Sequence, residues 1–97
     1  MTIERDWELV AVQWVDAFDG ETGWVHTDDY EPSPTVALNI GFIWPNALPD
    51  HVTLISGFIA DQEWPPEMVS NVCHIPTVMV QSVTRIGSSL DFRHKTL

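Results

Sequence analysis

The strongest constraint on the fold lies in residues 36–44, where large apolar side chains alternate with smaller or polar ones. Successive side chains of a strand point to opposite faces, whereas a helix would scatter a period of two around its surface. Residues 45–50 have the composition of a turn, and the alternation repeats in residues 52–60. The sequence therefore predicts an antiparallel hairpin. The large residues of its first strand are Val36, Leu38, Ile40, Phe42 and Trp44.

Three further segments are typical of strands. Residues 7–16 are rich in valine and tryptophan and apolar at both parities in their middle, so we expect a strand buried on both faces. In residues 77–86, six of ten side chains are β-branched, which favours a strand over the helix that the apolar spacing also allows. We expect a short strand ending at Pro76, a single turn, and a strand over residues 78–84.

The remaining segments predict loops and bends. Residues 27–34 are polar, acidic and interrupted by prolines, and residues 61–71 contain Pro65-Pro66, so both are expected to be loops, the second with at most one helical turn. Gly41 and Gly57 lie inside expected strands. A glycine at such a position indicates a bulge, a sharp bend or a close approach of another backbone.

About five short strands without a helix predict an all-β fold. A chain of 97 residues is too short for two domains, and a sandwich usually needs seven strands in about a hundred residues. We therefore expect a small five-stranded antiparallel barrel in residues 1–89, followed by a tail in residues 90–97. Closing the sheet would also protect its edges.

The charge of the chain excludes some partners. The chain has fourteen Asp and Glu but only four Lys and Arg, which gives a formal net charge of −10. Such a field repels polyanions, and nucleic-acid binding needs several cationic contacts, so nucleic acid is not expected as a partner. The bases are scattered, at Arg5, Arg85, Arg93 and Lys95.

Targeting signals and cysteine usage predict a cytoplasmic protein. The longest apolar stretches, residues 36–44 and 52–60, are about half the length of a membrane helix, so no membrane association is expected. The N-terminus has no apolar run typical of a signal peptide. The single cysteine, Cys73, cannot form an intrachain disulfide, which fits a reducing compartment.

No motif for catalysis or cofactor binding is present, so we expect neither an enzyme nor a cofactor. Residues 26–31 hold one imidazole and three carboxylates, which could hold a divalent cation, but they lack a known ligand spacing and are better explained as a solvated loop. Cys73 and His74 are adjacent, so a strand directs them to opposite faces and prevents joint catalysis. Cys73 is better explained as a small buried side chain.

The five tryptophans exceed what a small core needs. Trp14 and Trp44 lie inside expected strands and are assigned to the core or to a barrel end. Trp24 lies at a turn and Trp64 precedes Pro65-Pro66. Because aromatic and arginine side chains concentrate binding energy, the candidates for an interface or pocket are Trp24, Trp64, Tyr30 and Arg85.

Short motifs follow one another over residues 12–86, and they run in the order WVDA (14–17), GW (23–24), NIGFI (39–43), VTLI (52–55) and IP (75–76). This order resembles a group of small phage-encoded proteins of unknown function. The resemblance implies an Sm-like or SH3-like barrel, a homo-oligomeric ring as one assembly, and no catalytic residues. RNA-binding Sm proteins present basic surfaces, and the charge of −10 departs from that pattern.

These observations favour an acidic, non-enzymatic binding module that self-associates and engages a protein partner, for a phage protein one of the host. The first alternative is a small-molecule binder, for example of a nucleotide, with a pocket between subunits. The second is a structural component of a ring or a virion.

Overall fold

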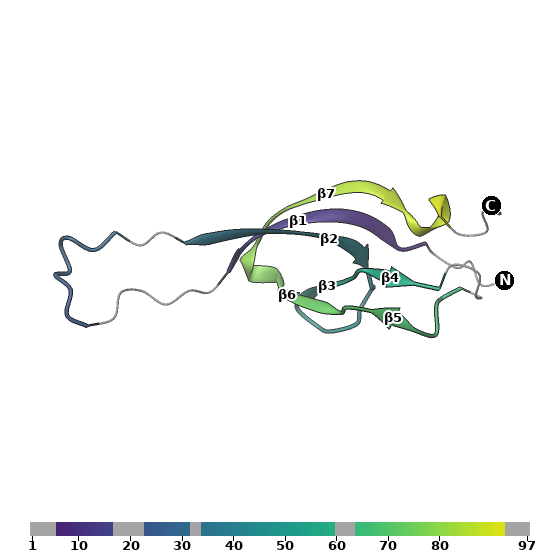
Figure 1. Ribbon diagram of the computed structural model, residues 1–97, viewed down its shortest axis with the longest axis horizontal. Coiled ribbons are helices and arrows are strands. Elements are labelled where there is room, and N and C mark those ends of the chain that lie inside the picture. Colours follow the sequence, from purple (N-terminus) through teal and green to yellow (C-terminus); the bar gives the residue numbers. More distant parts are fainter. Residues whose placement is uncertain (1–5, 17–22, 32–33, 60–63, 93–97) are drawn as a thin grey trace.

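The computed structural model describes residues 6–16, 23–31, 34–59 and 64–92. Five strands form one antiparallel sheet in the order β6-β3-β2-β1-β7 (Figure 1). Strands β4 and β5 form a second, two-stranded sheet, and two short 3-10 helices complete the described elements. The bounds are β1 Glu8–Asp16, β2 Thr35–Ile43, β3 His51–Ile55, β4 Gly57–Phe58, β5 Val69–Ser70, β6 Cys73–Pro76, η1 Thr77–Met79, β7 Val80–Ser88 and η2 Ser89–Asp91.

The all-β class and the five antiparallel strands are confirmed, but the closed barrel is not observed. The sheet ends at β6 on one side and at β7 on the other, and in the described part of the chain these two strands do not pair. They are joined by η1, the single turn expected after Pro76. The sheet is therefore open, and β7 is an edge strand.

The predicted hairpin is confirmed, although its second strand is shorter than expected. Phe42 pairs with Ile55 and Ile43 with Leu54. The return strand breaks at Ser56, after which β4 pairs with β5 instead. Position 41 requires a glycine, because a Cβ there would lie 2.7 Å from the carbonyl oxygen of Ile55. The close backbone approach that Gly41 indicated is therefore present.

The first core cluster lies on one side of the central strands, which we call the inner face. Val10 and Val12 of β1 are buried there against Leu54 of β3 and Ile75 of β6. Strands β3 and β6 thus cover the inner face of β1. The expectation that β1 is buried on both faces is met only on this side, because Gln13 is exposed and Leu9 and Ala11 are only half-buried.

The second core cluster is aromatic and lies near the start of β1. Trp7, Ile55 and Trp64 are buried, and Trp44 and Phe58 pack against them. The ring centroids of Trp7 lie 6.1 Å from those of Trp44 and 5.1 Å from those of Trp64. Trp44 therefore has the core role that its strand position predicted, and Trp64 joins it.

Residues 23–31 lie beyond the far end of the β1–β2 pair, away from both core clusters (Figure 1). Thr27–Asp29 form a turn in which the backbone N–H of Asp29 donates to the carbonyl of His26 at 3.1 Å. Every residue of this segment is exposed except the half-buried Tyr30. The predicted loop character is confirmed for its described part.

Candidate functional site

The four candidate residues lie in three different environments. Trp24 is fully exposed at 104%, and Tyr30 lies in the same segment. Arg85 is on the edge strand β7, whereas Trp64 is only 7% exposed and belongs to the aromatic core. Trp24 and Tyr30 therefore share a segment, but the four residues do not form one site.

Arg85 has an intrachain partner. Its Nε lies 3.4 Å from Oε1 of Glu8, which is the first residue of the neighbouring strand β1. Both side chains are more than half exposed, so the ion pair is screened by water and contributes little to stability. The guanidinium remains accessible at the sheet edge.

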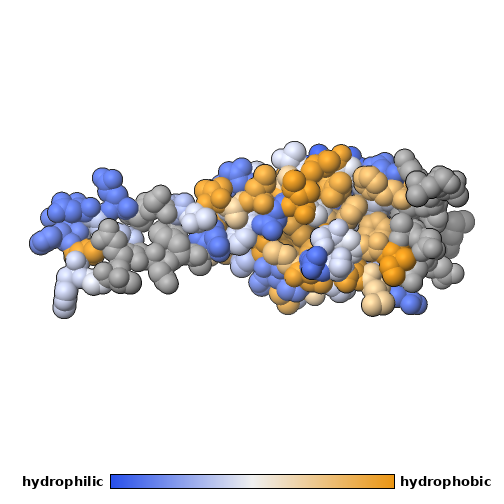
Figure 2. Space-filling model, in the orientation of Figure 1, coloured by the Kyte–Doolittle hydropathy of each residue, from blue (hydrophilic) through white to orange (hydrophobic). Residues whose placement is uncertain are grey.

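Residues 23–31, here called the acidic arm, combine an indole with carboxylates. Asp28, Asp29 and Glu31 are exposed along with Trp24 and Val25. Figure 2 shows mostly hydrophilic residues over this segment and many apolar residues, mixed with polar ones, over the strands. Throughout the described ranges, no group of three or more His, Cys, Asp or Glu is placed to hold a metal ion.

The side of the sheet opposite the inner face is mostly apolar, and it is exposed except at its Phe42 end, where the second core cluster packs against it. Paired residues of neighbouring strands lie side by side on one face. Val36, Leu38 and Ile40 of β2 are 51%, 63% and 61% exposed. They share this side, here called the outer face, with the residues paired to them on β1 and, through β1, on β7. The outer face consists of Leu9, Ala11, Gln13 and Val15, of Val36, Leu38, Ile40 and Phe42, and of Ser82 and Thr84.

Packing on the inner side of β2 explains why its large residues point outward. Gly41 leaves no room for a side chain beside the Ile55 carbonyl. Asn39 accepts a hydrogen bond from the indole Nε1 of Trp14 at 2.7 Å. At these two positions the inner side therefore takes a small or polar residue, and Val36, Leu38 and Ile40 are left in solvent on the other side.

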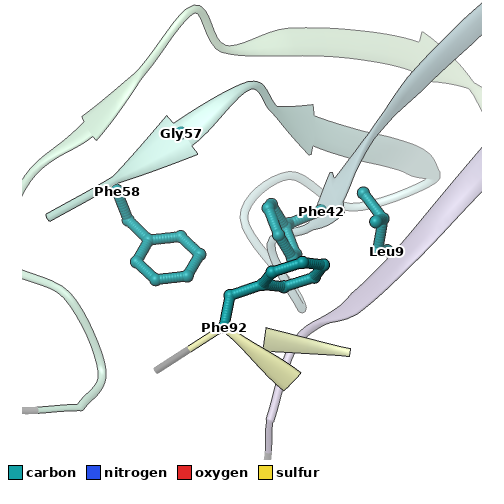
Figure 3. A pocket seen from close by; sticks show the side chains of 5 residues that line it. All are labelled: Leu9, Phe42, Gly57, Phe58 and Phe92. Atoms are coloured by element: carbon teal, nitrogen blue, oxygen red, sulfur yellow. The ribbon is translucent and has the colours of Figure 1, made fainter. Parts of the chain in front are cut away.

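An apolar pocket lies at one end of the outer face. It has a volume of about 360 Å³ and is lined by Leu9, Phe42, Gly57, Phe58 and Phe92 (Figure 3). The rings of Phe58 and Phe92 meet Phe42 edge-to-face, at centroid distances of 5.1 and 6.1 Å. Since none of the five lining residues has a charged or polar side chain, the pocket suits an apolar group.

Carboxylates are absent from most of the sheet. The sequence has no Asp or Glu between Glu31 and Asp50, and none between Glu67 and Asp91. Strands β2 to β7 therefore carry no carboxylate, and β1 carries them only at its two ends, Glu8 and Asp16. The negative charge of the molecule lies outside the outer face.

Comparison with protein-family models, with curated proteins and with solved structures finds no match to this chain. No helix in the described ranges has the length and apolar character that crossing a membrane requires. The candidate surfaces are therefore interpreted from their own chemistry.

The outer face is the feature that sequence reasoning missed. Its signal was the alternation in residues 36–44, which separates two sets of side chains without saying which set faces the core. The small set, Ala37, Asn39 and Gly41, faces inward here because the covering strand and the Trp14 indole need that space.

Proposed function

We propose that this chain is a non-enzymatic, acidic binding module that self-associates and uses the acidic arm to engage a protein partner with a basic surface. The observation that carries this proposal is the full exposure of Trp24 among Asp28, Asp29 and Glu31, beyond the end of the sheet. Tryptophan is enriched among residues that dominate binding energy, and surrounding charges steer a complementary partner.

The domain in this proposal is a barrel-like module of the Sm or SH3 type. Its support is the way β3 and β6 cover the inner face of β1, and the return of β7 to pair with the first strand. The phage origin and the host cytoplasm that the resemblance implies belong to the same proposal, as does a host protein as the partner.

The non-enzymatic part of the proposal rests on the placement of Cys73 and His74. Cys73 packs against the first core cluster, whereas the adjacent His74 is exposed. The Nδ1 atom of His74 lies 2.8 Å from Thr53 Oγ1, so the imidazole takes part in a hydrogen bond between strands β6 and β3. These positions fit structural roles.

Capture experiments with matched variants test the partner site. The purified protein is immobilised, incubated with bacterial lysate at about 50 mM salt and washed, and bound proteins are identified by mass spectrometry. We expect a basic protein that is retained by the wild type and lost with Trp24→Ala. Neutralising the arm with D28N, D29N and E31Q, or raising salt to about 500 mM, is expected to weaken retention because exposed charges are screened.

Val78→Ala is the control, because Val78 is also highly exposed but lies on η1, outside the acidic arm. It should retain the same protein as the wild type. If Trp24→Ala captures the same proteins in the same amounts, the arm is not the binding site. Retention that is unchanged by salt would contradict the role of the carboxylates.

The pocket favours a second candidate function, the binding of a small apolar molecule. Trp64, which the sequence made a candidate for an interface or pocket, is buried in the core, and the pocket lining offers only apolar groups. This chemistry suits an aliphatic or aromatic ligand better than a nucleotide. A fluorescent apolar dye tests it: binding to the wild type should fall at least several-fold with Phe92→Ala, whose ring is half exposed at the pocket rim.

A further inference from the structure

We propose that the outer face docks the outer face of a second copy of this chain, around a two-fold axis parallel to the strands. This inference rests on the self-association in the proposed function and names its surface and geometry. It starts from the apolar row of Val36, Leu38 and Ile40 on β2, which a single copy leaves more than half exposed. Contiguous apolar surface of this kind usually marks an interaction site.

Charge points to a second copy as the occupant. Each chain carries a formal net charge of −10, so two copies repel each other wherever carboxylates face one another. The outer face has no carboxylate among its ten residues. It offers two identical acidic chains a surface for apolar contact on which no carboxylates oppose each other.

The outer face is self-complementary in shape, because large side chains line one of its edges and small ones the other. Across the sheet from β2 to β7, Ile40 lies beside Ala11, and Ala11 lies beside Thr84. In the neighbouring row, Leu38 lies beside Gln13, and Gln13 lies beside Ser82. The β2 row is thus tall, and the β7 row is low. A two-fold axis parallel to the strands and passing over β1 places β2 of each copy over β7 of the other, so that tall side chains fill the low rows. An interface of this kind is isologous, and two twisted sheets pack in this way at about −30°.

The available area predicts a weak dimer. Three strands of nine residues span at most about 30 Å by about 14 Å, or roughly 420 Å² on each copy, and Phe42 at one end is already packed against the aromatic core. Stable interfaces bury about 800 Å² on each partner, and transient ones less than about 1,200 Å² in total. The dimer should therefore dissociate on dilution through the micromolar range.

Light scattering after size exclusion gives the first test. The wild type is expected to move from 11.0 kDa towards twice that mass as its concentration rises from about 1 μM to about 1 mM. Leu38→Asp should weaken this association at least tenfold, whereas Val78→Asp, which adds the same charge at an exposed site on η1, should not. Circular dichroism of both variants confirms that they are folded.

Cross-linking gives the second test and reads the geometry. Leu38→Cys is mixed with an affinity-tagged Ser82→Cys, both carrying Cys73→Ala, and treated with a short bismaleimide. Since the axis places position 38 of one copy over position 82 of the other, the mixed product should exceed each variant's product with itself. The separate chains exclude bridging within one molecule.

The outcomes separate this inference from the proposed function. A wild type that is monomeric at 1 mM overturns both the inference and the self-association in the proposed function, but leaves the acidic arm untouched. A dimer that Leu38→Asp does not weaken, or one in which Leu38→Cys links mainly to itself, overturns the inference alone. Loss of capture by Trp24→Ala bears only on the arm.

Discussion

Trp7 and Ser89 join the first and last described segments by a reciprocal pair of hydrogen bonds. The backbone N–H of Trp7 donates to Ser89 Oγ at 2.8 Å, and the backbone N–H of Ser89 donates to the carbonyl of Trp7 at 2.7 Å. Both residues are buried, and Trp7 also belongs to the aromatic core. This contact fixes the end of β7 beside the start of β1.

Removing the hydroxyl of Ser89 should therefore destabilise the fold. Ser89→Ala leaves the buried N–H of Trp7 without its acceptor, which should lower the free energy of unfolding by about 1–3 kcal/mol. Urea denaturation followed by far-UV circular dichroism measures the loss. Ser82→Ala, at an exposed position of β7, is the control and should change stability by less than about 0.5 kcal/mol. Equal effects of the two variants would contradict this account.

Gly41→Ala should destabilise the domain through overpacking. The added Cβ would lie 2.7 Å from the Ile55 carbonyl oxygen and 3.2 Å from the Cβ of Leu54, and neither atom belongs to the end of a flexible side chain. We expect a loss of about 1–3 kcal/mol in urea denaturation. At Gly57 the nearest atom is the hydroxyl of Ser70 at 3.0 Å, which can rotate away, so Gly57→Ala should cost less. If Gly57→Ala were more destabilising than Gly41→Ala, the close backbone approach at Gly41 would be contradicted.

Trp24 and Trp64 were both candidates for an interface or pocket, but their replacement should affect the free energy of unfolding differently. Trp64→Ala removes a buried ring that lies 5.1 Å from both Trp7 and Phe58, and should lower the free energy of unfolding by about 3–5 kcal/mol. Trp24→Ala should change it by less than about 0.5 kcal/mol, because the indole is fully exposed. Thermal and urea unfolding of the two variants compare these costs directly.

The Arg85–Glu8 pair should contribute little to stability. Because both side chains are exposed, Arg85→Ala should cost less than about 1 kcal/mol at low salt and less still at about 0.5 M salt. A double-mutant cycle with Glu8→Ala isolates the pair from other effects of either change. A coupling above about 2 kcal/mol would show that the pair is shielded from water.

The strands could be predicted from the sequence because each carries a local signal. The alternation in residues 36–44, the β-branched composition of residues 77–86 and the stop at Pro76 all correspond to observed strand limits within a few residues. The break at Ser56 could not be predicted, since it depends on the pairing of β4 with β5. Local patterns do not contain that information.

The candidate site was harder to predict, because exposure depends on packing between distant segments. Trp24 and Trp64 both lie beside turn-forming residues, yet Trp64 is buried by Trp7 and Phe58 from other parts of the chain. Phe92, placed by the sequence in a tail, meets Phe42 and lines the pocket. Only the assembled chain brings these rings together.

The outward row on β2 has a consequence for how the strand is held in place. Shifting β2 by one residue against β1 would bury Val36, Leu38 and Ile40. It would also turn Ile43 away from the first core cluster and Phe42 away from the second, so apolar burial within one chain does not by itself fix the pairing. The observed pairing is instead held by fit: the hydrogen bond from Trp14 to Asn39 and the space that only Gly41 leaves beside Ile55. A docked second copy would also cover Val36, Leu38 and Ile40 in the observed pairing, so that assembly would add to the selection of this alignment of the strand.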